Sequence, residues 1–119
     1  MRGKVTDEGV PILTLTVGDQ DWTTVIDTGF NGDLELPNEL RDLVQPRFKG
    51  QFHSLLAGGQ TILEDTFEVQ FPFDGQTVIA EATFTNSSEI LLGTGMLRRH
   101  RIGINFPKQS VRLNRVKLT

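Results

Sequence analysis

The sequence predicts an all-β domain, a barrel-like or folded-over sheet with one or two short helices. Apolar residues alternate with polar ones over short segments, as in residues 12–17, which is typical of strands with one buried face. Clusters of Gly, Asp, Asn and Pro separate these segments every few residues. Helical spacing of apolar residues is rare. With 119 residues and no low-complexity linker, we expect one domain over residues 1–119.

The first half of the chain is expected to hold three strands, one helix and a hairpin. Strands at 12–17 and 22–26 flank a turn at 18–21, and a short strand at 34–36 precedes Pro37. Asn38 has the side chain of a helix N-cap, and residues 40, 43 and 44 have helical spacing, so a helix should end near Pro46. Segments 48–56 and 60–64 flank three small residues, which predicts a mobile hairpin.

The second half is expected to contain two more hairpins and a buried strand. Segments 66–71 and 77–84 flank an Asp-Gly turn. The apolar run 90–93 predicts a buried strand, and a helical turn is expected within residues 96–101. Segments 101–106 and 110–113 form the last expected hairpin, with a possible terminal strand at 116–118.

Composition excludes several kinds of chemistry. There is no cysteine, so disulfides, thiolate catalysis, Fe–S clusters and Cys-ligated zinc are excluded, and a cytoplasmic location is expected. No apolar run approaches the roughly 20 residues of a membrane helix, and no signal peptide is evident. The two histidines, His53 and His100, lack metal-ligand spacing, and no phosphate-loop or dinucleotide motif is present. We therefore expect neither a metal nor a cofactor.

Charge is distributed unevenly along the chain. Residues 98–117 carry seven Lys and Arg residues and no acid, so the rest of the chain has 12 − 7 = 5 basic and 15 acidic residues. Such a split can indicate a nucleic-acid contact, complementary faces of one sheet, or two subunits that pair. Aromatic residues for base stacking are nearly absent from the basic segment, so nucleic-acid binding is the less favoured interpretation.

The residues that carry the chemistry are expected around Asp27. Val25 and Ile26 are β-branched residues suited to a buried strand, yet they run directly into a carboxylate, which is costly to bury without a partner. Thr28 and Gly29 follow. A bare Asp-Thr/Ser-Gly triplet arises by chance in about one chain in twenty of this length, so the triplet alone is uninformative.

The wider pattern resembles the retropepsin-like aspartic proteases. A strand ending in Asp-Thr-Gly at 27–29, a glycine-rich hairpin at 56–60 and an apolar-apolar-Gly step at 91–93 follow one another in that family's order. The run Asp-Thr-Gly-Phe-Asn-Gly-Asp-Leu-Glu-Leu-Pro at 27–37 is similar to that of small prokaryotic members. The pattern spans most of the chain.

The resemblance implies an aspartic endopeptidase acting on a peptide or protein substrate. Peptide hydrolysis by carboxylates needs two acids that share one proton, and the chain holds a single Asp-Thr-Gly. A homodimer with Asp27 of each subunit at the two-fold axis would supply both. Asp27 is then the catalytic acid and base, Thr28 fixes the two loops across the axis, and Gly29 allows close backbone approach. The terminal strands resemble those that form the retropepsin dimer sheet.

The resemblance also implies a substrate cleft. Leu56, Ala57, Gly58 and Gly59 correspond to the flap, Phe30 to the cleft wall, and Leu92 and Gly93 to the step behind the catalytic loop. Two positions depart from patterns in the family: Phe30 stands where viral members carry a small Ala or Ser, and Gly95 stands where an Asp or Asn often follows the apolar-apolar-Gly step. Asp33 and Glu35 fall in a turn and on an outward strand position, as do Asp21 and Asp65, so all four are interpreted as solvated.

Two other functions remain open from the sequence. One is a non-catalytic module that keeps the protease fold and captures peptides or dimerises without cutting them. The other is nucleic-acid binding through Arg98, Arg99 and Arg101.

Overall fold

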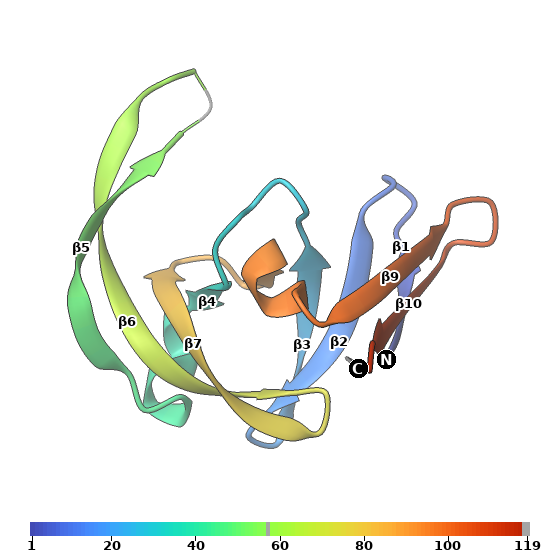
Figure 1. Cartoon of the computed structure of the whole chain (residues 1–119), viewed down its shortest axis with the longest axis horizontal. Helices are drawn as coiled ribbons and strands as arrows, with labels where there is room; N and C mark the ends of the chain where they lie inside the picture. The colour runs from blue at the N-terminus through green and yellow to red at the C-terminus, as the bar shows by residue number, and fades with distance from the viewer. Residues whose placement is uncertain (57, 118–119) are drawn as a thin grey trace.

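The computed structural model describes residues 1–56 and 58–117, and these form one ten-stranded sheet that curls on itself (Figure 1). Its spatial order is β5-β6-β7-β4-β8-β3-β2-β1-β10-β9. The strands are β1 (Arg2–Val5), β2 (Pro11–Val17), β3 (Gln20–Ile26), β4 (Leu34–Pro37), β5 (Arg47–Leu55), β6 (Thr61–Phe73), β7 (Gln76–Thr85), β8 (Ile90–Leu92), β9 (His100–Asn105) and β10 (Ser110–Arg115). The all-β prediction is confirmed.

Alternation along the strands produces the core. In β2, Leu13, Leu15 and Val17 are buried while the threonines between them are exposed, as a strand with one covered face requires. The same alternation in β4 and β10 directs further leucines inward. The largest fully buried side chains are Phe71, Leu13, Leu34, Leu36, Leu40, Ile90, Leu92 and Leu113.

Both helices are 3-10 helices, which corrects the expectation of an amphipathic α-helix. They are η1 (Asn38–Leu43) and η2 (Thr94–Leu97). Leu40 and Val44 are buried, but Leu43 is 53% exposed. Asn38 is not the N-cap, since Pro37 occupies that position, and the Asn38 side chain donates to Asn86 instead. Within the described residues, no helix is long and apolar enough to cross a membrane.

Several strand boundaries differ from the sequence prediction. Segments 61–64 and 66–71 are parts of one 13-residue strand, β6, which continues from the glycine-rich hairpin into the Asp74-Gly75 turn. Strand β1 was not predicted from the sequence. Residues 116 and 117 are not part of a strand, and residue 118 of the predicted terminal strand lies outside the described residues.

The terminal strands pair within the chain, at the right of Figure 1. β1 lies between β2 and β10, and β10 lies between β1 and β9. The Met1 ammonium group also donates to the Leu113 carbonyl oxygen at 2.6 Å. Because both edges of β1 and β10 are occupied, these strands leave no free edge for the shared dimer sheet that the resemblance implied.

The centre of the sheet positions the Asp27 loop. β8 pairs in parallel with β3 and antiparallel with β4, so it lies between the two strands that the 27–33 loop connects. The loop must therefore cross the end of β8. Its neighbours in space are the residues that follow β8, although these are more than 60 positions away in sequence.

Candidate active site

Asp27 leaves the end of β3 half-buried and held by its own loop. Its backbone N–H donates to the Leu92 carbonyl at 3.0 Å, which extends the β3–β8 ladder by one residue. The Oδ1 atom accepts a hydrogen bond from the Gly29 N–H at 2.9 Å, and the Asp27 carbonyl accepts one from the Phe30 N–H at 3.1 Å. Thr28 is exposed. The carboxylate is thus fixed in direction, with Thr28 beside it on the surface.

Three successive N–H groups after β8 fasten the rest of the loop. Gly93 donates to the Asp33 carbonyl at 2.9 Å, Thr94 to the Phe30 carbonyl at 2.8 Å, and Gly95 to the Gly32 carbonyl at 3.0 Å. These bonds satisfy loop carbonyls that no strand partner reaches. The predicted association of the 91–93 step with the catalytic loop is therefore present in the structure.

Glycine is required at positions 93 and 95, where the segment after β8 packs against the 27–33 loop. A β-carbon on Gly93 would lie 2.1 Å from the Gly32 carbonyl oxygen and 2.7 Å from a ring carbon of Phe30. A β-carbon on Gly95 would lie 2.0 Å from Asp33 Oδ1. Neither distance is possible for a real side chain, so the loop and the 93–95 segment pack at a spacing that only glycine permits.

Asp33 is a structural residue, which corrects its interpretation as a solvated carboxylate. Its Oδ2 atom accepts a hydrogen bond from the Glu81 N–H on β7 at 2.9 Å, and its Oδ1 atom fills the space beside Gly95. The sequence resemblance implied an Asp or Asn at position 95, where this chain has glycine, and the Asp33 carboxylate reaches the space beside Gly95 from the opposite segment. The missing side chain at Gly95 was the signal that could have identified it.

Glu35 is also not simply solvated. Burial raises its pKa, and the nearby Glu64 and Asp27 carboxylates raise it further. It shares a face of the sheet with Leu91, its cross-strand partner, and lines a hollow of about 640 Å³ together with Glu64 of β6. Its strand position does point away from the core, but the β5–β6 hairpin covers that face.

Leu92 does not line a cleft, which corrects its prediction as a substrate-binding residue. Its side chain is fully buried between β3 and β4. Leu91 is half-buried and lies on the opposite face, with Val25 and Glu35 as its strand neighbours. Because side chains alternate across a strand, Leu91 and Leu92 face opposite sides of the sheet.

The predicted flap is the tip of the long β5–β6 hairpin, which arches away from the sheet at the left of Figure 1. Leu56 donates to the Gln60 carbonyl at 2.7 Å, and Gly58 and Gly59 have φ angles of +93° and +84°. Ala57 lies outside the described residues. Leu55 is 75% exposed and Leu56 is 40% exposed, so the hairpin presents apolar side chains to solvent at its end.

The base of this hairpin faces the catalytic loop. A hollow of about 140 Å³ is bounded by Phe30 and Asp33 on the loop and by Ser54 and Thr66 on the hairpin. Phe30 borders this hollow, and its ring also packs against Gly93. Phe30 and the hairpin therefore face each other, Asp27 is not among the residues that line the hollow, and Gly93 packs against Phe30 from the other side.

The basic C-terminal segment divides into two groups. Arg101 and Arg112 lie on the outer face of β9 and β10, where Arg112 is paired with Arg2 of β1. Arg98, Arg99 and Arg115 surround a separate hollow beside η2. Within residues 1–56 and 58–117, no group of three His, Cys, Asp or Glu residues has the arrangement of a metal site.

Comparison with known proteins gives a structural match only. No family model and no curated protein sequence matches the chain. Its structure is similar to a retropepsin-like aspartic protease from Rickettsia conorii, with a TM-score of 0.65, 18% identity, and coverage of 97% of this chain and 89% of that one. It is similar to the EIAV protease in complex with the inhibitor HBY-793, with a TM-score of 0.58, 17% identity, and coverage of 78% and 89%.

A larger viral protein shares the same arrangement. The foamy viral protease-reverse transcriptase matches with a TM-score of 0.58 and 17% identity, over 91% of this chain and 13% of that one. The match spans the β3–β8–β4 centre and both ends of the sheet, because nearly the whole chain is covered. The chain has the retropepsin-like fold.

Proposed function

We propose that the protein is an aspartic endopeptidase that works as a homodimer, with the two Asp27 carboxylates at the two-fold axis. The proposal rests on the way in which the Asp27 carboxylate and its loop are held in place. Asp27 stands at the end of a buried strand, its Oδ1 atom is held by the Gly29 N–H, and its loop is fastened by the N–H groups of residues 93–95.

One subunit supplies only half of the required chemistry. Hydrolysis needs one carboxylate to take a proton from water and another to protonate the substrate. The Asp27 charge helps to raise the pKa of Glu35, but Glu35 lies on β4 and lines a different hollow together with Glu64. A second Asp27 from a symmetric partner would form a pair within about 3 Å that shares one proton.

In the proposed mechanism, the shared proton and a water molecule lie between the two carboxylates. The ionised Asp27 takes a proton from the water as it attacks the scissile carbonyl, and the protonated Asp27 donates to the carbonyl oxygen. The proton taken from water then passes to the departing amine, and no covalent acyl-enzyme forms.

The substrate would be an extended peptide held between the catalytic loop and the β5–β6 hairpin. The hollow between Phe30 and Ser54 provides space beside the loop, and the exposed Leu55 and Leu56 provide apolar cover from above. Main-chain hydrogen bonding to an extended peptide suits such a cleft, because it does not depend on the peptide's side chains. Closure of the hairpin tip would exclude water from the carboxylates.

The direct test is cleavage of an unfolded protein substrate between pH 4 and pH 7. The Asp27→Asn variant removes the acid and retains its shape, so kcat should fall by at least about a thousandfold. Asp42→Asn is the matched control, because Asp42 is exposed on η1 and away from the loop. It should cleave like the wild type.

The same experiment separates the peptidase from a peptide-binding module. Wild type and Asp27→Asn should bind an extended peptide with similar affinity, and only the wild type should cut it. If neither protein cuts any unfolded substrate while both retain peptide binding, the module is the correct function. If cleavage persists in Asp27→Asn, the assignment of Asp27 is wrong.

A further inference from the structure

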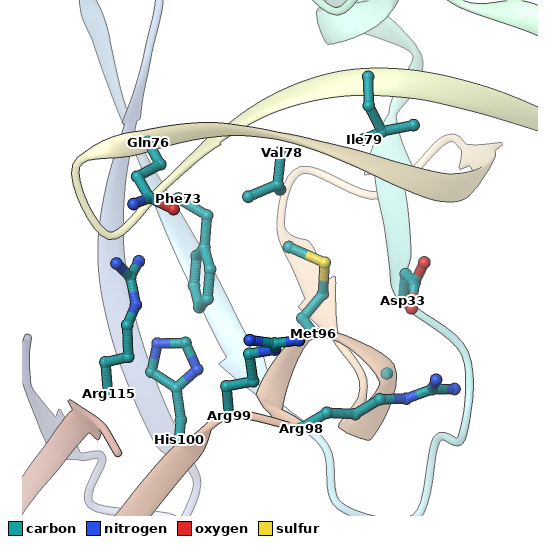
Figure 2. A pocket seen from close by; sticks show the side chains of 11 residues that line it. Asp33, Phe73, Gln76, Val78, Ile79, Met96, Arg98, Arg99, His100 and Arg115 are labelled. Atoms are coloured by element: carbon teal, nitrogen blue, oxygen red, sulfur yellow. The ribbon is translucent and has the colours of Figure 1, made fainter. Parts of the chain in front are cut away.

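The hollow beside η2, which Arg98, Arg99 and Arg115 border, is separate from the one between Phe30 and Ser54. It has a volume of about 250 Å³, compared with about 30 Å³ for one water molecule in the liquid. Figure 2 shows its side chains, which come from the β6–β7 turn, from η2 and the residues that follow it, and from the end of β10. The side chains that matter here are Phe73, Gln76, Arg98, Arg99, His100 and Arg115.

The three arginines make the hollow positively charged. Arg115 contacts Asp74, with its Nη2 atom 3.5 Å from the carboxylate and 3.3 Å from the Asp74 carbonyl oxygen. Arg98 and Arg99 form no ion pair with any residue that the structure describes. Asp33 also borders the hollow, but its carboxylate is turned to β7 and Gly95. In Figure 2 the Arg98 side chain runs away from His100, so the Arg99 guanidinium is the one available to an anion beside that ring.

His100 supplies the observation that points to a ligand. Its side chain is 5% exposed, and its Nε2 atom lies 3.1 Å from Asp74 Oδ2. The Nδ1 atom is buried and has no hydrogen-bond partner within the described residues. In Figure 2 one ring nitrogen lies on the Arg115 side and the other on the Arg99 side. Since Nε2 and Arg115 share Asp74, Nδ1 is the nitrogen on the Arg99 side. A buried nitrogen without a partner is costly, and a ligand at Arg99 would supply one.

The tautomer determines what kind of anion fits. Asp74 accepts, so Nε2 carries the proton, and in the neutral ring Nδ1 is a bare acceptor. A simple carboxylate or a sulfate ion has no proton to donate to it at neutral pH. A phosphate group that keeps one P–OH can donate to Nδ1 while its other oxygens accept from the Arg99 guanidinium group. We propose that this hollow is a phosphate-binding site formed by Arg99 and His100.

This site does not depend on the peptidase proposal, because the residues that would bind phosphate do not line the proposed substrate cleft. It does border the segment that fastens the catalytic loop, since Gly95 lines the hollow and donates to Gly32. A bound phosphate would therefore lie next to a segment on which the loop depends. The test below measures binding alone.

The experiment titrates inorganic phosphate into the full chain at pH 8, where an ordinary imidazole is neutral, with sulfate at equal ionic strength in parallel. Calorimetry should give saturable binding of one phosphate, at least about tenfold tighter than sulfate, a ratio equivalent to 1.4 kcal/mol. Imidazole ¹⁵N spectra should show a shift of the His100 Nδ1 resonance. His53 is exposed on β5 and is the internal control.

Two arginine variants distinguish specific phosphate binding in the hollow from non-specific attraction to positive charge. Arg99→Gln should weaken phosphate binding about tenfold or more, because a charge-assisted hydrogen bond is lost. Arg112→Gln removes the same charge on the outer face of β10 and should change affinity less than twofold. Non-saturable binding, equal losses in both variants, equal affinity for sulfate, or a His100 Nδ1 resonance that does not move would each overturn the proposal.

Discussion

Gly93 packs against Gly32 so closely that a β-carbon at position 93 would lie 2.1 Å from the Gly32 carbonyl oxygen. The strand that separates β3 from β4 thus ends directly behind the loop that carries Asp27. The obstacle is backbone, which cannot rotate aside as a side chain can. The position of the catalytic loop therefore depends on the absence of one methyl group.

Replacing Gly93 with Ala should destabilise the fold by about 3 kcal/mol, because the loop must move and its hydrogen bonds to residues 93–95 must break. Gly103→Ala is the control, since Gly103 lies on strand β9 and nothing stands within 4 Å of its missing β-carbon. It should change stability by less than about 0.5 kcal/mol, or increase it. Urea unfolding measures both, and a Gly93→Ala protein as stable as the wild type would contradict the observed packing.

Asp33 and Gly95 should be energetically coupled. A methyl group at position 95 would lie 2.0 Å from Asp33 Oδ1, so Gly95→Ala should be strongly destabilising. Asp33→Ser should cost about 1 kcal/mol by itself, through loss of the hydrogen bond from the Glu81 N–H. In the double variant the shorter side chain relieves part of the clash, which gives a favourable coupling of about 1 kcal/mol. Additive losses in the four-protein unfolding cycle would show that the two residues do not compete for space.

Glu35→Gln should stabilise the protein at neutral pH. The raised pKa of Glu35 means that the folded state binds its proton more tightly than the unfolded state, whose value is near 4.5. Stability is then lost as pH rises from about 4.5 through the folded pKa, and the ionised form remains a cost above it. The gain at pH 7 should be below about 1 kcal/mol, because the side chain keeps contact with solvent.

The pH profile of unfolding tests the source of that gain. At pH 3.5 wild type and Glu35→Gln should have the same stability, since the wild-type carboxyl is then neutral in both states. Glu39→Gln, at an exposed position on η1, should leave the profile unchanged. A gain that is constant from pH 3.5 to pH 7 would mean that charge is not its cause.

The hairpin tip should affect catalysis separately from stability. Gly59 and Gly9 have φ angles of +84° and +86°, and neither has an atom within 4 Å of its missing β-carbon. Alanine at either position should therefore cost a similar 1–2 kcal/mol, roughly, from the left-handed backbone alone. Only Gly59→Ala should lower kcat/KM for an unfolded substrate, because Gly9 lies in the β1–β2 turn. Equal activity in the two variants would remove the hairpin from the mechanism.

Much of the fold could be predicted because its signals are local. Alternation identifies β2, and the Asp-Gly turn identifies the β6–β7 hairpin, whose register runs from Phe67 to Phe73 against Gln76 to Ala82. The short helix after Pro37 was expected, but it winds as a 3-10 helix over residues 38–43, which apolar spacing alone does not distinguish from an α-helix over so few residues. Strand β1 was missed because its stabilising partner, β10, lies at the other end of the chain.

The site could be predicted where a motif marks it and not where distant segments meet. Asp27 was identified from its own neighbours in sequence. The role of Asp33 depends on Glu81 and Gly95, which are 48 and 62 residues away. The burial of Glu35 depends on a hairpin that folds over an otherwise outward face. Leu92 was assigned to the wrong face because a motif fixes a position in sequence and not the direction of its side chain.

The central claim is that one active site needs Asp27 from two subunits, and subunit mixing tests it most directly. Wild type and Asp27→Asn are unfolded together, refolded at varied ratios with total protein constant, and assayed for cleavage of an unfolded substrate. If both carboxylates are required, activity follows the square of the wild-type fraction and falls to about a quarter in an equal mixture. Activity that falls only to about half, in proportion to the wild-type fraction, would contradict the account and assign the chemistry to a single subunit.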